Sequence, residues 1–279
     1  MTTWLITGTS SGFGRSLTEL LLERGDTVAA TLRRPDALAD LQSRHGTRLW
    51  VRTLDVTDTP ALRRVVDEAF AELGTVDVAV SNAGYGLFGA AEELDDAEIL
   101  RQLDTNVVAS IQLARALVPH LRGQGGGRIL QLSSLGGQVG FPGLSVYHAS
   151  KWAIEGFFEA FGPEVAPFGI QTMLVEPGMS RTEFAGSSAR IGAPHTRYDG
   201  GVLRVDSVAR EAMPGDPRKM ARAMIAAAER DQLPARLSLG SDAYTMIREA
   251  LQTRLARLEE QRDLAFSTDA DDYRPPPAA

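Results

Sequence analysis

The sequence contains no cysteine and only two lysines among its 279 residues. Without cysteine the chain can form no disulfide, no thiolate nucleophile and no cysteine-built metal site. The four histidines are scattered, and no two of them stand at the spacing that places a pair of metal ligands on one helix face. We therefore expect no bound metal.

Excess positive charge and long apolar runs are also missing. The formal net charge is −7 at pH 7, which argues against a nucleic-acid partner, because such partners require a basic face. No apolar run approaches the length that spans a bilayer, and the amino terminus lacks the basic start and apolar core of a signal peptide. These features predict a globular, cytoplasmic protein that binds neither nucleic acid nor membranes.

Short apolar segments alternate with helical patterns along the chain. The predicted strands are residues 3–7, 27–32, 48–54, 76–81, 128–133, 169–175 and 237–239. The predicted helices are residues 14–24, 35–44, 60–73, 95–122, 147–161 and 217–231, the third with Thr59 as its N-cap. This alternation predicts an α/β fold, a Rossmann-like doubly wound parallel sheet with helices on both faces. Ligands bind such sheets beyond the carboxyl ends of the strands.

No linker or internal repeat divides the chain, so we expect one domain over residues 1–266. Residues 183–215 are rich in Gly, Ser, Ala and Pro and are predicted to form a substrate lid. A C-terminal helix at 241–264 is expected either to pack against the domain or to close the lid. Its apolar stripe consists of Tyr244, Ile247, Leu251, Leu255 and Leu258. The acidic, proline-rich tail at 267–279 is predicted to be disordered.

A glycine-rich loop joins the first predicted strand to the first helix. Residues 7–14 have the sequence TGTSSGFG, with glycines spaced G-x-x-x-G-x-G. Glycines let the backbone turn sharply and approach a ligand, and the following helix presents free N–H groups to a phosphate. The strand before the loop and the helix after it favour nucleotide binding over a plain turn.

Tyr147 stands four residues before Lys151, one of the two lysines. On a helix, residues at this spacing share a face with their Cβ atoms roughly 5–6 Å apart. A cation beside a phenol favours the ionised form and lowers the tyrosine pKa toward the range that suits an acid or base at neutral pH. The alternative is a surface pair without function.

Together these motifs resemble the short-chain dehydrogenase/reductase family, in the single-domain branch with a T-G-x-x-x-G-x-G loop and a Y-x-x-x-K pair. The resemblance extends from Thr3 to about Phe184. Further motifs in the family's order are Asp55-Val56, Ser81-Asn82-Ala83-Gly84 (N-N-A-G in the family) and the P-G-x-x-x-T match from Pro177 to Thr182. Phe13 replaces the commoner isoleucine or leucine, which affects packing more than chemistry.

The resemblance implies a catalytic tetrad of Asn106, Ser134, Tyr147 and Lys151. Ser134 is preferred to Ser133 because the family usually places this serine thirteen residues before the tyrosine. The cofactor contacts that it implies are Gly8, Ser10, Ser11, Gly12, Phe13, Gly14, Asp55, Val56, Asn82, Ala83, Gly84, Tyr147, Lys151, Pro177, Gly178 and Thr182. In this scheme the tyrosine protonates the carbonyl oxygen and the asparagine anchors a water that passes protons to the lysine.

The end of the second predicted strand bears on the choice of cofactor. NAD-preferring relatives have an acidic residue there, which binds the ribose 2′-hydroxyl. This chain has Leu32 followed by Arg33 and Arg34, two guanidiniums able to bind a 2′-phosphate. We therefore predict a preference for NADP(H), with NAD(H) and two solvated arginines as the alternative.

The expected function is NADP(H)-dependent interconversion of a ketone or aldehyde and an alcohol. Aromatic and aliphatic residues near the motifs favour an apolar carbonyl substrate: Tyr85, Phe141, Leu144 and Phe184. Arg181 and Arg190 could bind one carboxylate. The resemblance also implies a homodimer or homotetramer, since helix 147–161 carries aromatic residues on several faces.

Two other classes of function stay open. The first is a cofactor-binding regulator without turnover, against which the complete tetrad argues. The second is an isomerase or dehydratase that uses bound cofactor transiently. Relatives of that second kind generally have a differently spaced glycine loop and a larger C-terminal substrate domain.

Overall fold

Seven parallel strands form one sheet in the order β3-β2-β1-β4-β6-β7-β9. The computed structural model describes residues 1–185, 189–193, 196–198 and 209–274. The strands of the sheet are β1 (Thr3–Thr7), β2 (Thr27–Leu32), β3 (Leu49–Thr53), β4 (Val78–Ser81), β6 (Gly127–Leu132), β7 (Ile170–Pro177) and β9 (Arg236–Leu239). The predicted doubly wound fold is confirmed, and the strand order reverses at β1, between β2 and β4. A separate pair joins β5 (Leu87–Phe88) to β8 (Arg190–Ile191).

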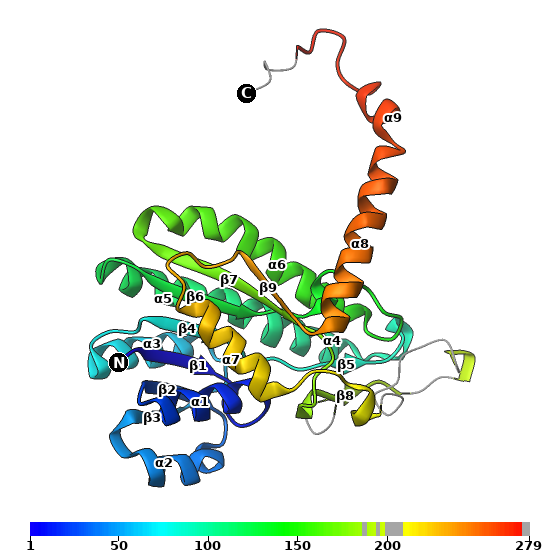
Figure 1. The fold of residues 1–279 in the computed structure, drawn as a ribbon. Coiled ribbons are helices and arrows are strands. Elements are labelled where there is room, and N and C mark those ends of the chain that lie inside the picture. Colours follow the sequence, from blue (N-terminus) through cyan, green and yellow to red (C-terminus); the bar gives the residue numbers. More distant parts are fainter. Residues whose placement is uncertain (186–188, 194–195, 199–208, 275–279) are drawn as a thin grey trace.

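Helices cover both faces of this sheet (Figure 1). They are α1 (Gly12–Arg24), α2 (Ala39–His45), α3 (Thr59–Leu73), α4 (Asp96–Leu103), α5 (Ala109–Gly123), α6 (Ser145–Val165), α7 (Pro217–Ala228), α8 (Ser241–Glu259) and α9 (Arg262–Phe266). Among the described residues, no helix combines the length and apolar character that a bilayer span requires.

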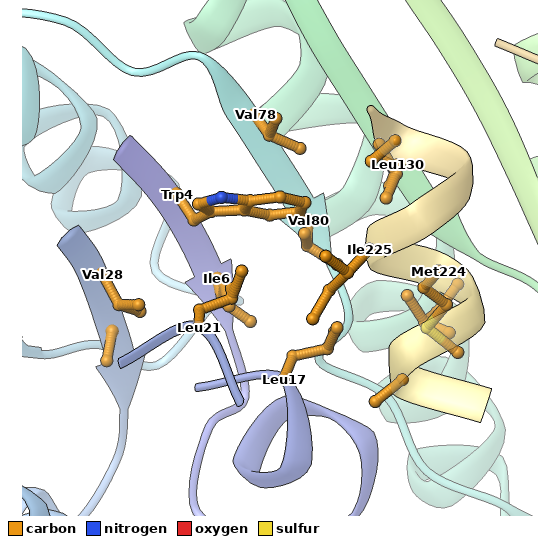
Figure 2. Close-up of a cluster of buried hydrophobic side chains, with 14 of the residues drawn as sticks. Trp4, Ile6, Leu17, Leu21, Val28, Val78, Val80, Leu130, Met224 and Ile225 are labelled. Carbon is orange, nitrogen blue, oxygen red and sulfur yellow. The ribbon is translucent and has the colours of Figure 1, made fainter. Parts of the chain in front are cut away.

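Alternate residues of each strand enter two separate hydrophobic cores. Trp4 and Ile6 of β1 pack with α1 and α7 on one face, as Figure 2 shows. Leu5 points to the other face, toward α3, α5 and α6. This period of two follows from strand geometry, and it explains why Trp4, Leu5 and Ile6 form a continuous apolar run in β1.

The helix starts correct one prediction and confirm another. The N-cap of α3 is Asp58, whose side chain accepts a hydrogen bond from the Ala61 N–H, so Thr59 is already helical. The sequence Asp216-Pro217 predicts that Asp216 caps the helix at 217–231, and Asp216 is indeed the N-cap of α7, accepting from the Lys219 N–H. The carboxylate one residue earlier explains the shift at α3, because aspartate caps at least as well as threonine.

The long helix predicted at 95–122 is interrupted. A π-helical turn at Asp104–Val108 separates α4 from α5 and contains Asn106. Such a turn adds one residue to the helical repeat and is common at functional sites. Apolar periodicity does not reveal it.

The C-terminal helix forms, but most of its apolar stripe does not pack against the domain. Ile247 is 7% exposed, whereas Leu251, Leu255 and Leu258 are 51%, 57% and 64% exposed. Figure 1 shows α8 leaving the domain and α9 continuing away from it. The packing prediction is therefore wrong beyond Ile247. Periodicity shows which residues share a face but not what lies opposite that face.

Candidate active site

The carboxyl ends of the strands border a cavity of about 1340 Å³. This exceeds the roughly 300–1,000 Å³ typical of small-molecule sites, so it can hold more than one small ligand. The predicted residues that line it are Gly8, Ser10, Ser11, Gly12, Phe13, Arg33, Arg34, Asp55, Val56, Asn82, Ala83, Gly84, Ser134, Tyr147, Lys151, Pro177, Gly178 and Thr182. Gly14 and Asn106 do not line it.

The glycine loop is shaped to admit an anionic ligand at the start of α1. Gly8 and Gly12 have φ angles of +71° and +56°, a region that favours glycine. A Cβ on Gly14 would lie 2.3 Å from the Gly8 carbonyl oxygen. Ser11, the N-cap of α1, makes no side-chain capping bond, so the first N–H groups of the helix are available to a phosphate. These features fit the pyrophosphate of a dinucleotide.

Asn82 supports this loop from β4. Its Nδ2 donates to the carbonyl oxygens of Thr7 at 2.8 Å and Gly8 at 3.0 Å. Its backbone N–H donates to the Thr7 hydroxyl at 3.0 Å. The motif after β4 thus fixes the conformation of the glycine loop.

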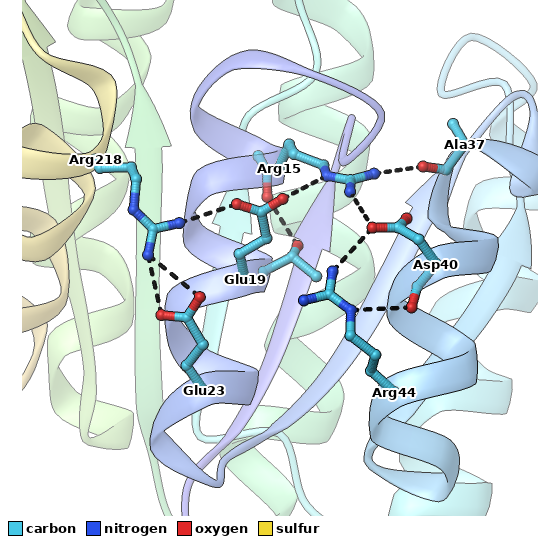
Figure 3. Close-up of polar contacts among 9 residues, drawn as sticks. Arg15, Glu19, Glu23, Ala37, Asp40, Arg44 and Arg218 are labelled. Atoms are coloured by element: carbon cyan, nitrogen blue, oxygen red, sulfur yellow. Dashed lines mark hydrogen bonds and ion pairs between the residues drawn. The ribbon is translucent and has the colours of Figure 1, made fainter.

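Arg33 and Arg34 follow β2 and are exposed on the cavity wall. Neither forms an ion pair with another described residue. The segment after them is tied to α1, because Arg15 donates to the Ala37 carbonyl oxygen and pairs with Asp40 (Figure 3). Both guanidiniums line the cavity near the loop that would bind phosphate, and the Arg33 charge also acts on the Asp55 carboxylate.

Asp55 borders the cavity on the same side. Its carboxylate accepts hydrogen bonds from the Thr57 N–H at 3.0 Å and the Thr57 hydroxyl at 2.8 Å. Burial opposes ionisation of Asp55, but these bonds outweigh it and hold the pKa of the carboxyl below its usual value.

Ser134, Tyr147 and Lys151 come together at the centre of the cavity. Tyr147 and Lys151, on α6, are 6% and 7% exposed. The Lys151 ammonium donates to the Leu132 carbonyl oxygen at 2.8 Å and lies 5.8 Å from the centre of the Tyr147 ring. The Ser134 hydroxyl accepts from the Gly136 N–H at 3.0 Å, and Ser134 lies close enough to Tyr147 to influence the pKa of its phenol.

The expectation that Lys151 lowers the pKa of Tyr147 is not met within the protein itself. Burial raises the pKa of Tyr147 to about 12, and the neighbouring Ser134 hydroxyl opposes this rise. Burial also lowers the pKa of Lys151 to about 8, against the charge of Glu155. Helix spacing brings the two groups together, but it does not show that both lose their hydration.

Asn106, in the π-helical turn, is 1% exposed, and both polar atoms of its side chain form hydrogen bonds. Its Oδ1 accepts from the Tyr85 N–H at 3.1 Å. Its Nδ2 donates to the Tyr85 carbonyl oxygen at 3.0 Å and to the Ser150 hydroxyl at 3.1 Å. Asn106 therefore joins the segment after β4 to α6, behind the cavity wall.

The other end of the cavity is apolar. The predicted Tyr85, Phe141, Leu144 and Phe184 line it, together with Phe88, Met213 and Met246, which no motif identified. The Phe184 ring lies 5.2 Å from the Tyr147 ring. Of the two arginines considered for a substrate carboxylate, Arg190 lines the cavity, whereas Arg181 donates to the Met213 carbonyl oxygen. In the predicted lid, residues 186–188, 194–195 and 199–208 lie outside the described residues.

Residues 2–190 match the family model for short chain dehydrogenases. The chain belongs to the short-chain dehydrogenase/reductase family. It is 35% identical to the oxidoreductase BOA17 of Botryotinia fuckeliana, over 95% of this chain and 98% of that protein. It is 34% identical to a 3-ketodihydrosphingosine reductase of Bacteroides thetaiotaomicron, over 85% of this chain and 87% of that protein.

A solved structure has the same fold over nearly the whole chain. It is a short-chain dehydrogenase from Streptomyces avermitilis, with a TM-score of 0.90, 38% identity, and coverage of 96% of this chain and 98% of that one. The protein is therefore an oxidoreductase of the family, and a nicotinamide dinucleotide is its cofactor class.

His148 is a residue of this dehydrogenase that the sequence did not single out. Its Nδ1 donates to the Gly136 carbonyl oxygen at 2.8 Å, and its Nε2 accepts from the Phe141 N–H at 2.9 Å. These two bonds fix one neutral tautomer and tie α6 to the serine loop, residues 133–138. Burial lowers the pKa of His148, against the bond to Gly136. Only the fold brings these backbone groups to the ring.

Proposed function

We propose that this dehydrogenase reduces apolar ketones or aldehydes with NADPH, and oxidises the alcohols in reverse. The observation that carries the proposal is the buried Tyr147 phenol, which lines the cavity together with Ser134, Lys151 and the residues of the glycine loop. When bound, the nicotinamide supplies the hydride.

Each of the four tetrad residues has a separate task in this proposal. Ser134 holds the carbonyl oxygen of the substrate, and Tyr147 gives that oxygen its proton. The high pKa of Tyr147 keeps the phenol protonated at neutral pH, which suits a proton donor. The positive charge of Lys151 stabilises the phenolate that forms when Tyr147 gives up its proton. Lys151 would also hold the nicotinamide ribose. Asn106, whose side chain is committed to Tyr85 and Ser150, holds α6 in place behind the cavity wall, and the Tyr147 phenolate regains its proton from solvent.

The NADP preference rests on the groups after β2. Leu32 brings no carboxylate that would repel a 2′-phosphate, and Arg33 and Arg34 are exposed beside the glycine loop. Gly8 to Gly14 would hold the pyrophosphate and Asp55-Val56 the adenine. The P-G-x-x-x-T motif, through Thr182, would hold the carboxamide.

The apolar substrate class rests on the apolar side chains that line the cavity. Phe88, Leu144, Phe184, Met213 and Met246 supply aromatic and flexible apolar surface there. The relative named as a 3-ketodihydrosphingosine reductase supports a carbonyl on a long apolar chain.

We also propose a homodimer or homotetramer. Trp152 on α6 is 44% exposed, and the stripe on α8 is exposed in the single chain. Exposed apolar surface of this kind is costly in water and is commonly covered by another subunit.

A panel of ketones and aldehydes with NADPH tests the proposal. NADPH absorbance should fall over time when an apolar ketone is added, and it should fall faster as the chain of the ketone lengthens. Tyr147→Phe should abolish this oxidation of NADPH. If the cofactor binds but no carbonyl compound is reduced, a regulator without turnover is favoured. If a substrate is altered while NADPH stays constant, an isomerase or dehydratase is favoured.

A further inference from the structure

The carboxylate of Glu155 lies beneath the serine loop, one helical turn after Lys151 on α6. Glu155 is 3% exposed, and its Oε1 accepts a hydrogen bond from the Ser133 hydroxyl at 2.5 Å. A Cβ on Gly137 would lie 1.9 Å from the same oxygen. The backbone that carries Ser134 therefore rests directly on this carboxylate.

Glu155 shares its cation with a second buried carboxylate. Nη1 of Arg236, on β9, contacts Glu155 at 2.6 Å and also contacts Glu176 on β7, which is 1% exposed. Nη2 of Arg236 contacts Glu159 at 2.6 Å, and the Gln138 amide donates to Glu155. One guanidinium thus faces three carboxylates, two of them buried, and the cluster keeps a net negative charge.

Lys151 is the nearest buried cation on the same helix. Its ammonium donates to the neutral Leu132 carbonyl oxygen, and no described carboxylate pairs with it directly. Residues four apart on a helix share a face, so Glu155 presents its charge toward Lys151. Burial lowers the pKa of Lys151 and the Glu155 charge opposes this. Burial raises the pKa of Glu155, while Ser133 and Arg236 oppose that rise.

We infer that Glu155 is a positioning residue for the dehydrogenase: it holds the serine loop through Ser133 and supplies the buried negative charge that keeps Lys151 cationic. Ser133 thereby commits its hydroxyl to Glu155, which leaves Ser134 to face the phenol. The effect on turnover rests on the proposed function, whereas the effect on Lys151 does not.

The scarcity of lysine allows the charge effect to be measured without a substrate. Protein with ¹³Cε-labelled lysine carries two such side chains, Lys151 and Lys219. A pH titration of the ¹³Cε shifts follows Lys151 directly. Lys219 lies on α7 and serves as an internal reference that must be the same in every variant.

Three variants separate charge from general disruption. In Glu155→Gln, Lys151 should titrate at lower pH than in wild type, by about half a unit or more, because a buried negative charge is gone. Glu155→Asp keeps the charge and should titrate close to wild type. Glu159→Gln is the matched control, since it removes an exposed carboxylate from the same guanidinium. An unchanged Lys151 in folded Glu155→Gln, or an equal shift in Glu159→Gln, would overturn the inference.

Variants of Ser133 test whether Glu155 positions the serine loop. They leave Glu155 in place, so they test the inference even if Glu155→Gln does not fold. Ser133→Ala keeps the carboxylate and should lower kcat on the order of tenfold to hundredfold, with KM for NADPH within several-fold. Ser133→Thr restores the hydroxyl and should recover most of kcat. Wild-type turnover in folded Ser133→Ala contradicts the positioning role. If wild type itself reduces nothing in the panel, the proposed function fails, while the lysine titration still decides the role of the charge.

Discussion

At the scale of single residues, the proposed chemistry depends on one buried hydroxyl. Tyr147→Phe keeps the ring that contacts Phe184 but removes the proton donor. Reduction should become undetectable while NADPH affinity stays within several-fold, which steady-state kinetics and a fluorescence titration with NADPH measure. Substantial residual turnover would mean that another acid protonates the substrate.

The cofactor preference is also decided by single side chains. Each charge-assisted bond from Arg33 or Arg34 to a 2′-phosphate should contribute roughly 1.5–3 kcal/mol. Arg33→Ala should therefore lose most of the preference for NADPH. Leu32→Asp should turn it toward NADH by adding a ribose acceptor and a repulsive charge. Titration of wild type with both cofactors is the reference, and NADH binding as tight as NADPH binding would contradict the assignment.

At the scale of elements, the start of α1 depends on the absence of a side chain at Gly14. A Cβ there would meet the Gly8 carbonyl oxygen at 2.3 Å and the Asn82 Nδ2 at 2.6 Å. Gly14→Ala should cost about 1–3 kcal/mol of stability and weaken NADPH binding. Gly156→Ala is the control, because Gly156 is on α6 with nothing within 4 Å of its Cβ position. It should stabilise the protein by up to about 1 kcal/mol in urea unfolding.

The contact between α6 and the serine loop should make stability depend on pH through His148. Burial holds the pKa of the folded imidazole below its usual 6.5, so the folded state takes up its proton later than the unfolded state. The stabilisation that the neutral His148 gives to the folded state is complete above pH 6.5. It is lost as the pH falls from 6.5 through the pKa of His148 in the folded state.

His148→Gln removes this titration. At pH 7.5 the variant should be less stable than wild type by about 1 kcal/mol, as expected for weakened hydrogen bonds. That difference should shrink at pH 5.5, because the histidine contribution to wild-type stability decreases as the pH falls below 6.5. Urea unfolding at both pH values measures it, and a constant difference would remove His148 as the cause.

At the scale of the whole molecule, α8 extends an apolar stripe away from the domain (Figure 1). Ala243 and Ile247 pack near Leu135, and Arg254 contacts Gln138 and Trp152, but Leu251, Leu255 and Leu258 are exposed. If a second subunit covers the remainder, the combined change of Leu251, Leu255 and Leu258 to Gln should reduce the oligomer to a smaller species. Light scattering after gel filtration measures the mass. An unchanged mass would leave α6 as the candidate interface.

Much of the fold was predictable because it depends on local patterns. Apolar runs and glycines specify β1, β2 and the turn at Gly8 whatever surrounds them. The spacing of Tyr147 and Lys151 likewise placed them on one helix face. The order of the motifs along the chain was enough to predict their meeting at the carboxyl ends of parallel strands.

Tertiary structure alone decided what depends on burial and on distant partners. It buried Tyr147 and Lys151 together, so desolvation raises the pKa of the phenol and lowers the pKa of the ammonium. It brought Glu155 to Ser133 and Arg236 from separate elements. It also left the stripe on α8 uncovered, because periodicity describes one helix and not its surroundings. Sequence determined which residues share a face, and only the fold determined what each face meets.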